Sequence, residues 1–270
     1  MGNVYRHEYE LLSRCENLLE SDVCREELLS EFETLTKKYK SLLRKTEKIT
    51  KISDSLQNRL IAEQEKTDQL LLNTLPAKVV DDLKKFGKTW PDNFRDVTVY
   101  LSDIVGFTKL SSRIEPRYLI DELNEIFTAF DDIMEHNRCE RIKTIGDAYM
   151  AVCGMPEPNP DHTKNIIQAA VEIMKYMKER YADRSPKWEI RIGIHTGQVV
   201  GGIVGVKKYI YDIFGDTINT ASRMEANSLP MRINVSEPAY LLAKEIFSFQ
   251  EREELEVKGK GMMKMYFLDF

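Results

Sequence analysis

The chain shows two patterns of hydrophobic positions. Between residues 28 and 74, apolar positions recur at alternating spacings of four and three residues, which is the period of a coiled coil. One seam contains Leu28, Leu35, Leu42, Ile49, Leu56, Glu63 and Leu70, and the other contains Phe32, Tyr39, Thr46, Ser53, Leu60, Thr67 and Thr74. Beyond residue 95, short runs with strand-like alternation are interspersed with helical stretches. The pattern therefore predicts a helical N-terminal part followed by a mixed globular part.

The helical part is expected to span residues 1–75. A short amphipathic helix over 3–20 precedes a long helix for which Ser21 and Asp22 offer a cap. The seam leucines favour a parallel two-stranded coiled coil, although polar seam residues predict only moderate pairing strength. Two interpretations stay open, a plain dimerisation stalk and a stalk that transmits a signal. Because Pro76 cannot continue the helix, residues 76–94 are expected to form a helix–loop linker.

The globular part, residues 95–270, is predicted to be α+β. The expected helices and strands are listed here in chain order: strand 97–102, helix 115–136, hairpin 141–152, helix 161–182, strand 188–195, a glycine-rich segment (Gly197, Gly201, Gly202, Gly205), helix 215–226, strand 231–235, helix 237–245, and strands 247–257 and 263–269. Because the chain lacks a βαβ glycine fingerprint, this order favours α+β over a doubly wound sheet.

Composition excludes several classes of protein. The net charge of −5 does not support nucleic-acid binding through a basic surface. The sequence contains no apolar run of membrane-spanning length and no signal-peptide pattern, so we expect a cytoplasmic protein or the cytosolic part of a larger receptor. The four cysteines show no CxxC spacing and no histidine cluster, which predicts reduced thiols and argues against zinc.

Two aspartates are candidates for binding divalent cations. Asp147 follows Gly146 at the predicted corner of the 141–152 hairpin, and Asp103 ends the 97–102 strand. Taken alone, a Gly-Asp pair is usually only a turn. Two carboxylates at one sheet edge can, however, share a pair of metal ions, as chemistry on a polyphosphate requires.

Two further pairs of residues suggest a nucleotide site. Asn219 and Arg223 are spaced i and i+4, so they share one helix face and suit a phosphoryl group that gains charge; the alternative is an ordinary solvated face. Lys143 and Asp212 lie among apolar neighbours, where an unpaired charge is costly. Together they can read a purine edge, or they can simply form a cross-strand ion pair.

Several groups are candidates for contacting phosphates. Arg191 and either Lys258 or Lys260 are basic, and a glycine follows each lysine. The backbone N–H groups of Gly106, Phe107 and Thr108 open the next predicted helix and can cradle phosphates. Because His195 lies on a buried-looking strand without an evident carboxylate partner, we interpret it as structural.

Four segments together resemble the catalytic domain of class III nucleotide cyclases. They are LSDIVGFTK (101–109), IKTIGDAYM (142–150), RIGIHTG (191–197) and GIVGVKKYIYDIFGDTINTASRME (202–225). The resemblance runs from Val97 to the C-terminus, about two thirds of the chain. It implies a ferredoxin-like domain that works as a head-to-tail homodimer.

The resemblance also implies a role for each candidate residue. Asp103, Ile104 and Asp147 would bind two Mg²⁺ or Mn²⁺ ions. Lys143 and Asp212 would select adenine, since members that make cyclic GMP typically carry Glu and Cys there. Asn219 would orient the ribose and Arg223 would stabilise the transition state. The phosphates would contact Gly106, Phe107, Thr108, Arg191 and, of the two lysines, Lys258.

The implied activity is conversion of ATP to 3′,5′-cyclic AMP and pyrophosphate. Each site would take its metal aspartates from one chain and Lys143, Asp212, Asn219 and Arg223 from the other. The alternatives are a guanylate cyclase and an inactive cyclase-like module that only dimerises and binds nucleotide. An upstream sensor domain or partner is expected to supply the regulatory signal.

Overall fold

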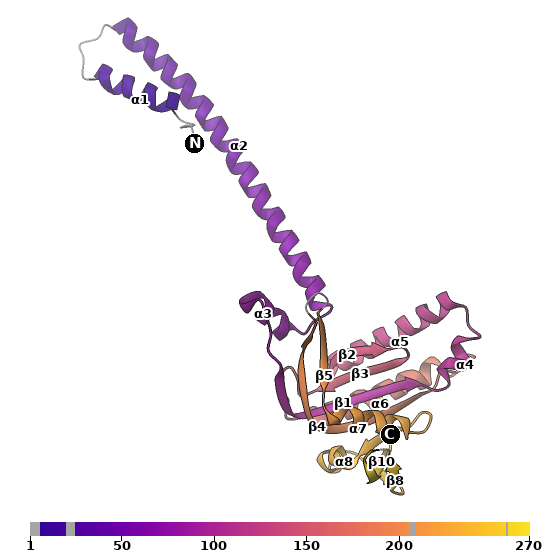
Figure 1. The fold of residues 1–270 in the computed structure, drawn as a ribbon. Coiled ribbons are helices and arrows are strands. Elements are labelled where there is room, and N and C mark those ends of the chain that lie inside the picture. The colour runs from indigo at the N-terminus through magenta and orange to yellow at the C-terminus, as the bar shows by residue number, and fades with distance from the viewer. Residues whose placement is uncertain (1–5, 20–24, 206–208, 258) are drawn as a thin grey trace. The chain divides into compact units, whose positions relative to one another are not determined.

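The chain divides into two compact units, Met1–Leu71 and Leu72–Phe270, as seen in a computed structural model (Figure 1). The structure describes residues 6–19, 25–205, 209–257 and 259–270. Among these residues, no helix has the length and apolar character needed to cross a membrane. The described cysteines Cys15, Cys139 and Cys153 are free, and Cys24 lies outside the described residues.

The first unit is a pair of helices, α1 (Arg6–Leu19) and α2, whose full span is Arg25–Leu72. Helix α1 folds back along α2 (Figure 1), and its Leu11 is only 3% exposed. Leu35 and Leu42 of the predicted seam line a groove with Leu11 and Leu12, so α1 covers this part of the seam. The long helix is confirmed, but Thr74 lies beyond its end and is wrong as a seam position. Pairing of two chains through α2 stays a prediction.

The second unit begins with a short helix, α3 (Ala77–Phe86), that follows Pro76 as predicted. Helix α3 ends at Gly87, whose φ of +68° places it in the left-handed region, and the Gly87 N–H donates to the Leu83 carbonyl. Glycine adopts this conformation at little cost, which explains the end of the helix.

An eight-stranded sheet with helices forms the rest of the unit. The strands are β1 (Asp92–Ile104), β2 (Glu140–Ile145), β3 (Ala148–Cys153), β4 (Ile190–Val204), β5 (Ile210–Phe214), β6 (Ile233–Ser236), β7 (Phe249–Glu251) and β10 (Met265–Leu268). The helices are α4 (Phe107–Ser111), α5 (Pro116–His136), α6 (His162–Arg180), α7 (Asp216–Ala226) and α8 (Glu237–Ala243). The strand order is β2-β3-β1-β4-β6-β10-β7, and β5 pairs with β4. The β1-α5-β2-β3-α6-β4 core confirms the predicted ferredoxin-like topology.

The structure corrects three strand boundaries. Strand β1 begins at Asp92, five residues before the predicted 97. Strand β4 does not stop near 195 but continues through the glycines to Val204, because β5 pairs with it. A Cβ at Gly201 would lie 2.8 Å from the Tyr211 hydroxyl, so glycine here permits a close approach rather than a loop. The predicted 247–257 strand is two strands, β7 and β8 (Leu255–Val257), and β8 pairs with β9 (Gly261–Met263) in a separate sheet.

The two faces of the central strands differ. Tyr100 of β1 and Ile192 and Ile194 of β4 point to the main core, where they pack with Ile126 and Phe130 of α5. Successive residues of a strand face opposite sides of the sheet. Asp103, Arg191 and Gly193 occupy the alternate positions and therefore point to the face that α7 covers. A Cβ on Gly193 would lie 2.0 Å from the Glu225 backbone nitrogen of α7. The alternation of side chains along the strands thus places Asp103 of β1 and Arg191 of β4 beside α7.

Candidate active site

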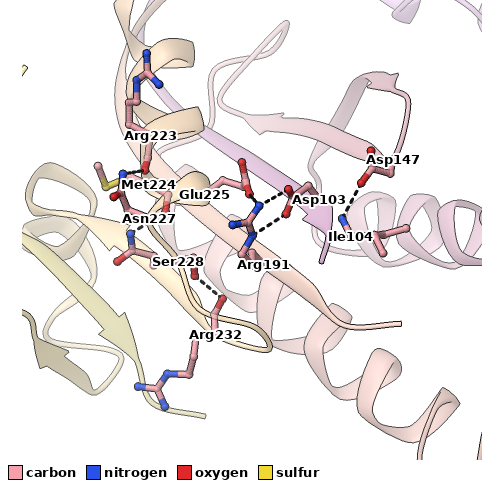
Figure 2. A network of polar contacts seen from close by, with 11 residues as sticks. Asp103, Ile104, Asp147, Arg191, Arg223, Met224, Glu225, Asn227, Ser228 and Arg232 are labelled. Carbon is pink, nitrogen blue, oxygen red and sulfur yellow. Dashed lines mark hydrogen bonds and ion pairs between the residues drawn. The ribbon is translucent and has the colours of Figure 1, made fainter. Parts of the chain in front are cut away.

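The centre of the candidate site is an ion pair between β1 and β4. Asp103 and Arg191 are opposite each other in the antiparallel register. Arg191 binds Asp103 with two parallel hydrogen bonds, Nε to Oδ1 at 3.1 Å and Nη2 to Oδ2 at 2.5 Å (Figure 2). The side chains are 29% and 23% exposed, so the pair is partly shielded from water. A residue predicted to bind metal is therefore bonded here to one predicted to bind phosphate.

Glu225 joins this pair, although the sequence did not single it out. Its Oε1 lies 3.2 Å from Arg191 Nη2, yet this buried oxygen has no hydrogen-bond partner among the described residues. The two atoms are close enough to interact, but the angles between them do not suit a hydrogen bond. The sequence did carry one signal, since Glu225 is one helical turn after Ala221, which is fully buried in α7.

The environment perturbs the charges of this group. Burial raises the pKa of Glu225 to about 8, the neighbouring Asp103 carboxylate acts in the same direction, and Arg191 opposes both. Burial also raises the pKa of Asp147, against the hydrogen bonds from its own backbone N–H and that of Ile104. The carboxylates therefore lie close enough to repel one another, as expected where cations are to be bound.

Asp147 reaches the same sheet edge from the β2–β3 turn. Gly146 has a φ of +64°, so the two-residue Gly146-Asp147 turn forms the tight hairpin that the sequence predicted. The Asp147 Oδ2 accepts a hydrogen bond from the Ile104 N–H at 3.3 Å, which ties the turn to the end of β1 (Figure 2).

The donor set at this edge fits a divalent cation. Within the described part of the chain, no three His, Cys, Asp or Glu side chains form a complete metal cage. Mg²⁺, however, is usually held by one or two carboxylates plus waters and substrate phosphates. Asp103 and Asp147, with the backbone of Ile104 between them, supply hard oxygen donors of this kind.

Lys143 and Asp212 form a second charged pair. The Lys143 Nζ donates to Asp212 Oδ2 at 2.5 Å, and the other carboxylate oxygen accepts from the Ile213 N–H at 2.8 Å. Lys143 lies on β2 and Asp212 on β5, which are not hydrogen-bonded neighbours in the sheet. The side chains are 31% and 17% exposed, so a ligand can still reach them. The tertiary fold, rather than strand pairing, brings these residues together.

Asn219 and Arg223 both lie on α7 and are exposed. Figure 2 shows the Arg223 side chain directed away from Asp103. Within the described residues, neither side chain has a hydrogen bond or ion pair, and only the backbone carbonyl of Arg223 is engaged, by Asn227. The side chains of Asn219 and Arg223 are thus available to bind a ligand or a second chain.

The remaining predicted residues are the candidates for binding phosphates. Gly106, with a φ of +69°, precedes the short helix α4, which contains Phe107 and Thr108. Lys260 forms an ion pair with Asp216 at the start of α7. Lys258 lies outside the described residues.

His195 fits the structural interpretation. It is 9% exposed, and its Nδ1 is 2.7 Å from the Ser236 hydroxyl. Burial lowers the pKa of His195 to about 4, Lys260 acts in the same direction, and Asp216 opposes them.

A single chain thus assembles two separate polar groups. Asp103, Asp147, Arg191 and Glu225 form one, and Lys143 with Asp212 forms the other. No hydrogen bond or ion pair between described residues joins the two groups or joins either of them to Arg223.

Comparison with known proteins gives a consistent result. Residues 90–269 match the family model of the adenylate and guanylate cyclase catalytic domain. The receptor-type guanylate cyclase gcy-28 of Caenorhabditis elegans is 40% identical over 212 residues, covering 77% of this chain and 17% of that protein. An adenylate cyclase of Mycobacterium bovis is 36% identical over 208 residues, covering 77% of this chain and 47% of that protein. The chain therefore spans less than half the length of either relative.

A solved structure supports the same assignment. The catalytic core of a rhodopsin-guanylyl cyclase with converted specificity, in complex with ATPαS, is 36% identical to this chain with a TM-score of 0.63. The match covers 67% of this chain and 98% of that structure. With the fold, the paired aspartates and these matches agreeing, the chain belongs to the class III adenylate and guanylate cyclase catalytic-domain family.

Proposed function

We propose that the protein is an adenylate cyclase that converts ATP to 3′,5′-cyclic AMP and pyrophosphate. The observation that carries the choice of base is the Lys143–Asp212 pair at 2.5 Å. Lysine only donates hydrogen bonds and an ionised aspartate only accepts them. They complement the ring-nitrogen acceptor and the exocyclic amino donor of adenine, whereas the keto oxygen of guanine offers Asp212 no donor.

Guanylate cyclase activity is the second candidate. It is favoured by the relatives, since the matching proteins of Caenorhabditis elegans and Homo sapiens are named guanylate cyclases. By the family resemblance, members that make cyclic GMP typically carry Glu and Cys at the base-selecting positions, whereas this chain carries Lys143 and Asp212. We therefore give the two residues more weight than the names.

The chain's own residues suit this reaction. Asp103 and Asp147 would hold two divalent cations, Mg²⁺ or Mn²⁺, with the backbone of Ile104. Such ions lower the pKa of a bound hydroxyl and neutralise phosphate charge. Arg223 would stabilise the charge that develops as the ribose 3′-oxygen attacks the α-phosphorus, and Asn219 would orient the ribose.

Phosphate binding is assigned to a separate set of groups. Gly106, Phe107 and Thr108 would offer backbone N–H groups, and Arg191 and Lys258 would offer positive charge. Since Lys260 is paired with Asp216, it is the less suitable of the two lysines.

A homodimer would complete each site. Asn219 and Arg223 are exposed and have no partner within the described chain, and they are not joined to the metal aspartates. In a head-to-tail dimer, one chain supplies Asp103 and Asp147 while its partner supplies the base and ribose groups. A parallel coiled coil through α2 would hold the two chains together, in the cytoplasm, and would couple them to an upstream sensor domain or partner.

The first experiment measures turnover of ATP against GTP with Mn²⁺ and with Mg²⁺. We expect cyclic AMP from ATP, and loss of that activity in Asp147→Ala. Asp132→Ala, which changes an exposed aspartate on α5, is the matched control and should keep full activity. Cyclic GMP as the main product would contradict the choice of base. Nucleotide binding without turnover would instead support an inactive cyclase-like module.

A mixing experiment tests the shared site. Asp147→Ala and Arg223→Ala should each be inactive alone. In an equal mixture, about half of the dimers would combine both chains, and one of their two sites would be intact, which restores about a quarter of wild-type activity. Absence of any recovery, with mixed dimers shown to form, would contradict the shared site.

A further inference from the structure

We propose that Glu225 is a positioning residue that receives Arg191 when Asp103 binds a divalent cation. The inference rests on the proposed function, because it concerns the metal carboxylate of that site. It assigns a role to a glutamate that the predicted site did not include.

Asp103 cannot serve Arg191 and a cation in the same way at once. Both of its carboxylate oxygens accept hydrogen bonds from the guanidinium, at 3.1 Å and 2.5 Å (Figure 2). A cation bound to the same oxygens would lie beside the guanidinium and would be repelled by its positive charge. Metal binding therefore requires Arg191 to loosen or leave this contact.

Leaving Asp103 without a new partner would be costly for Arg191. Its side chain is 29% exposed, and a partly buried guanidinium that loses its carboxylate keeps the desolvation cost without the compensating attraction. An alternative carboxylate within reach removes most of that cost.

The Glu225 side chain is such an acceptor, and above its raised pKa of about 8 it is mostly a carboxylate. Its Oε1 is already 3.2 Å from Arg191 Nη2 and is buried without a hydrogen bond, so it has unused capacity to accept one. The Glu225 side chain is 14% exposed, less than that of either Asp103 or Arg191. A small change in the Arg191 side chain would turn the ion pair into a hydrogen-bonded one.

The backbone around Glu225 is fixed. Gly193, two residues after Arg191 and on the same face of β4, touches the backbone of α7 at Glu225 so closely that a Cβ would lie 2.0 Å from its nitrogen. Strand β4 and the last turn of α7 therefore hold Arg191 and Glu225 at a set separation. In this arrangement the guanidinium moves between two carboxylates on a rigid frame.

The test measures metal binding without turnover. Mn²⁺ is titrated into the full chain at about pH 8.5, where Glu225 is mostly ionised, and without nucleotide, so that no phosphate competes for Mn²⁺ or for Arg191. Free Mn²⁺ is followed by its electron paramagnetic resonance signal. In Glu225→Gln, Arg191 stays on Asp103, and we expect the apparent Kd for Mn²⁺ to rise about 10-fold, the scale of losing a group that supports a metal ligand.

A double-mutant cycle separates positioning from a direct effect of charge. Arg191→Met removes the competitor while keeping an apolar stem. In that background, Glu225→Gln should change the Kd for Mn²⁺ by less than about 2-fold, since coupled residues show non-additive effects. An equal loss of affinity in both backgrounds, or none in either, would overturn the inference.

The control is a glutamate with a similar pairing elsewhere. Glu122 of α5 is 5% exposed and accepts two hydrogen bonds from Arg180 of α6, at 3.0 Å and 2.9 Å, so its partners lie outside the group around Asp103. Glu122→Gln should lower thermal stability and leave the Kd for Mn²⁺ unchanged. If wild type bound no Mn²⁺, this inference would fail, and the ATP and GTP turnover assay would decide the proposed function separately. Wild-type binding with an additive cycle would also overturn this inference alone.

Discussion

The helical first unit and the catalytic unit use their apolar residues in opposite ways. In the catalytic unit, large side chains such as Tyr100, Phe130 and Tyr149 are at most 1% exposed. In α2, by contrast, no described residue is buried, and Phe32, Leu56 and Leu60 are at least 60% exposed. The catalytic unit buries its large apolar side chains within one chain, whereas the long helix of the first unit leaves its own exposed.

The difference predicts which unit depends on a partner for its stability. Exposed apolar residues in a regular seam lose contact with water only when another surface covers them. The seam near Leu35 and Leu42 is partly covered by α1, which leaves the part from Ile49 to Leu70 for a second chain. We therefore expect the stability of the first unit to depend on protein concentration. The stability of the catalytic core should not.

A matched pair of phenylalanines gives the largest contrast. Phe130→Ala empties a site that is 1% exposed, and it should lower the free energy of unfolding of the catalytic unit by about 3–5 kcal/mol. Phe32→Ala, at a site 63% exposed, should leave that value unchanged. Urea unfolding followed by tryptophan fluorescence reports on this unit alone, because Trp90 and Trp188 both belong to it. Equal losses in the two variants would break the contrast.

The buried histidine should make the stability of the catalytic unit depend on pH. The pKa of His195 is lowered to about 4 by burial, so its contribution is fully present above the ordinary pKa of about 6.5 and is lost as pH falls through about 4. The contribution is at most about 3 kcal/mol.

This pH effect is measured as the fall in Tm between pH 6.5 and pH 4. His195→Asn, which keeps an acceptor or donor near Ser236, should flatten the fall. His136→Asn, on the exposed end of α5, is the control and should not. His162 is buried too, but it is present in both variants, so its effect on the Tm cancels when they are compared. An unchanged slope in His195→Asn would contradict the assignment.

A charge in the seam should affect only the first unit. Leu56→Lys removes the burial of one leucine from each chain of the dimer, worth about 1.5–3 kcal/mol each, and should raise the dimer dissociation constant at least about 10-fold. Ser55→Lys adds the same charge at the adjacent position outside the seam and is the control. Sedimentation over a range of concentrations measures both. No change in Leu56→Lys would mean that the chains do not pair through this seam.

The last prediction concerns the choice between ATP and GTP, and it should leave the pairing of the chains unchanged. Lys143→Glu combined with Asp212→Cys should lower the ratio of kcat/KM for ATP to that for GTP by about 10- to 100-fold, since it replaces the polar groups that face the base. Sedimentation of this variant should match wild type, because neither residue is in the first unit. A ratio that does not move would show that other residues choose the base.

Local patterns in the sequence predicted most of the architecture. The heptad spacing predicted the long helix, Gly146-Asp147 predicted the tight turn, and the order of strands and helices predicted the α+β class, whereas the ferredoxin-like core was implied by the family resemblance. These features depend on residues close together in the chain, where period and turn chemistry are decisive. The glycines of β4 were misleading because their role is to admit Tyr211 and Thr217 from other elements.

The sequence by itself singled out the candidate residues, since Asp103, Asp147, Lys143 and Asp212 were proposed from their positions in the predicted strands and from the family resemblance. Only the tertiary structure decided how they are paired. The register of β1 against β4 puts Arg191 on Asp103, and the contact of α7 with Gly193 brings Glu225 to the same guanidinium. Charged side chains pair across distances of a few ångströms, and those distances are set by sheet register and helix packing between segments far apart in the chain.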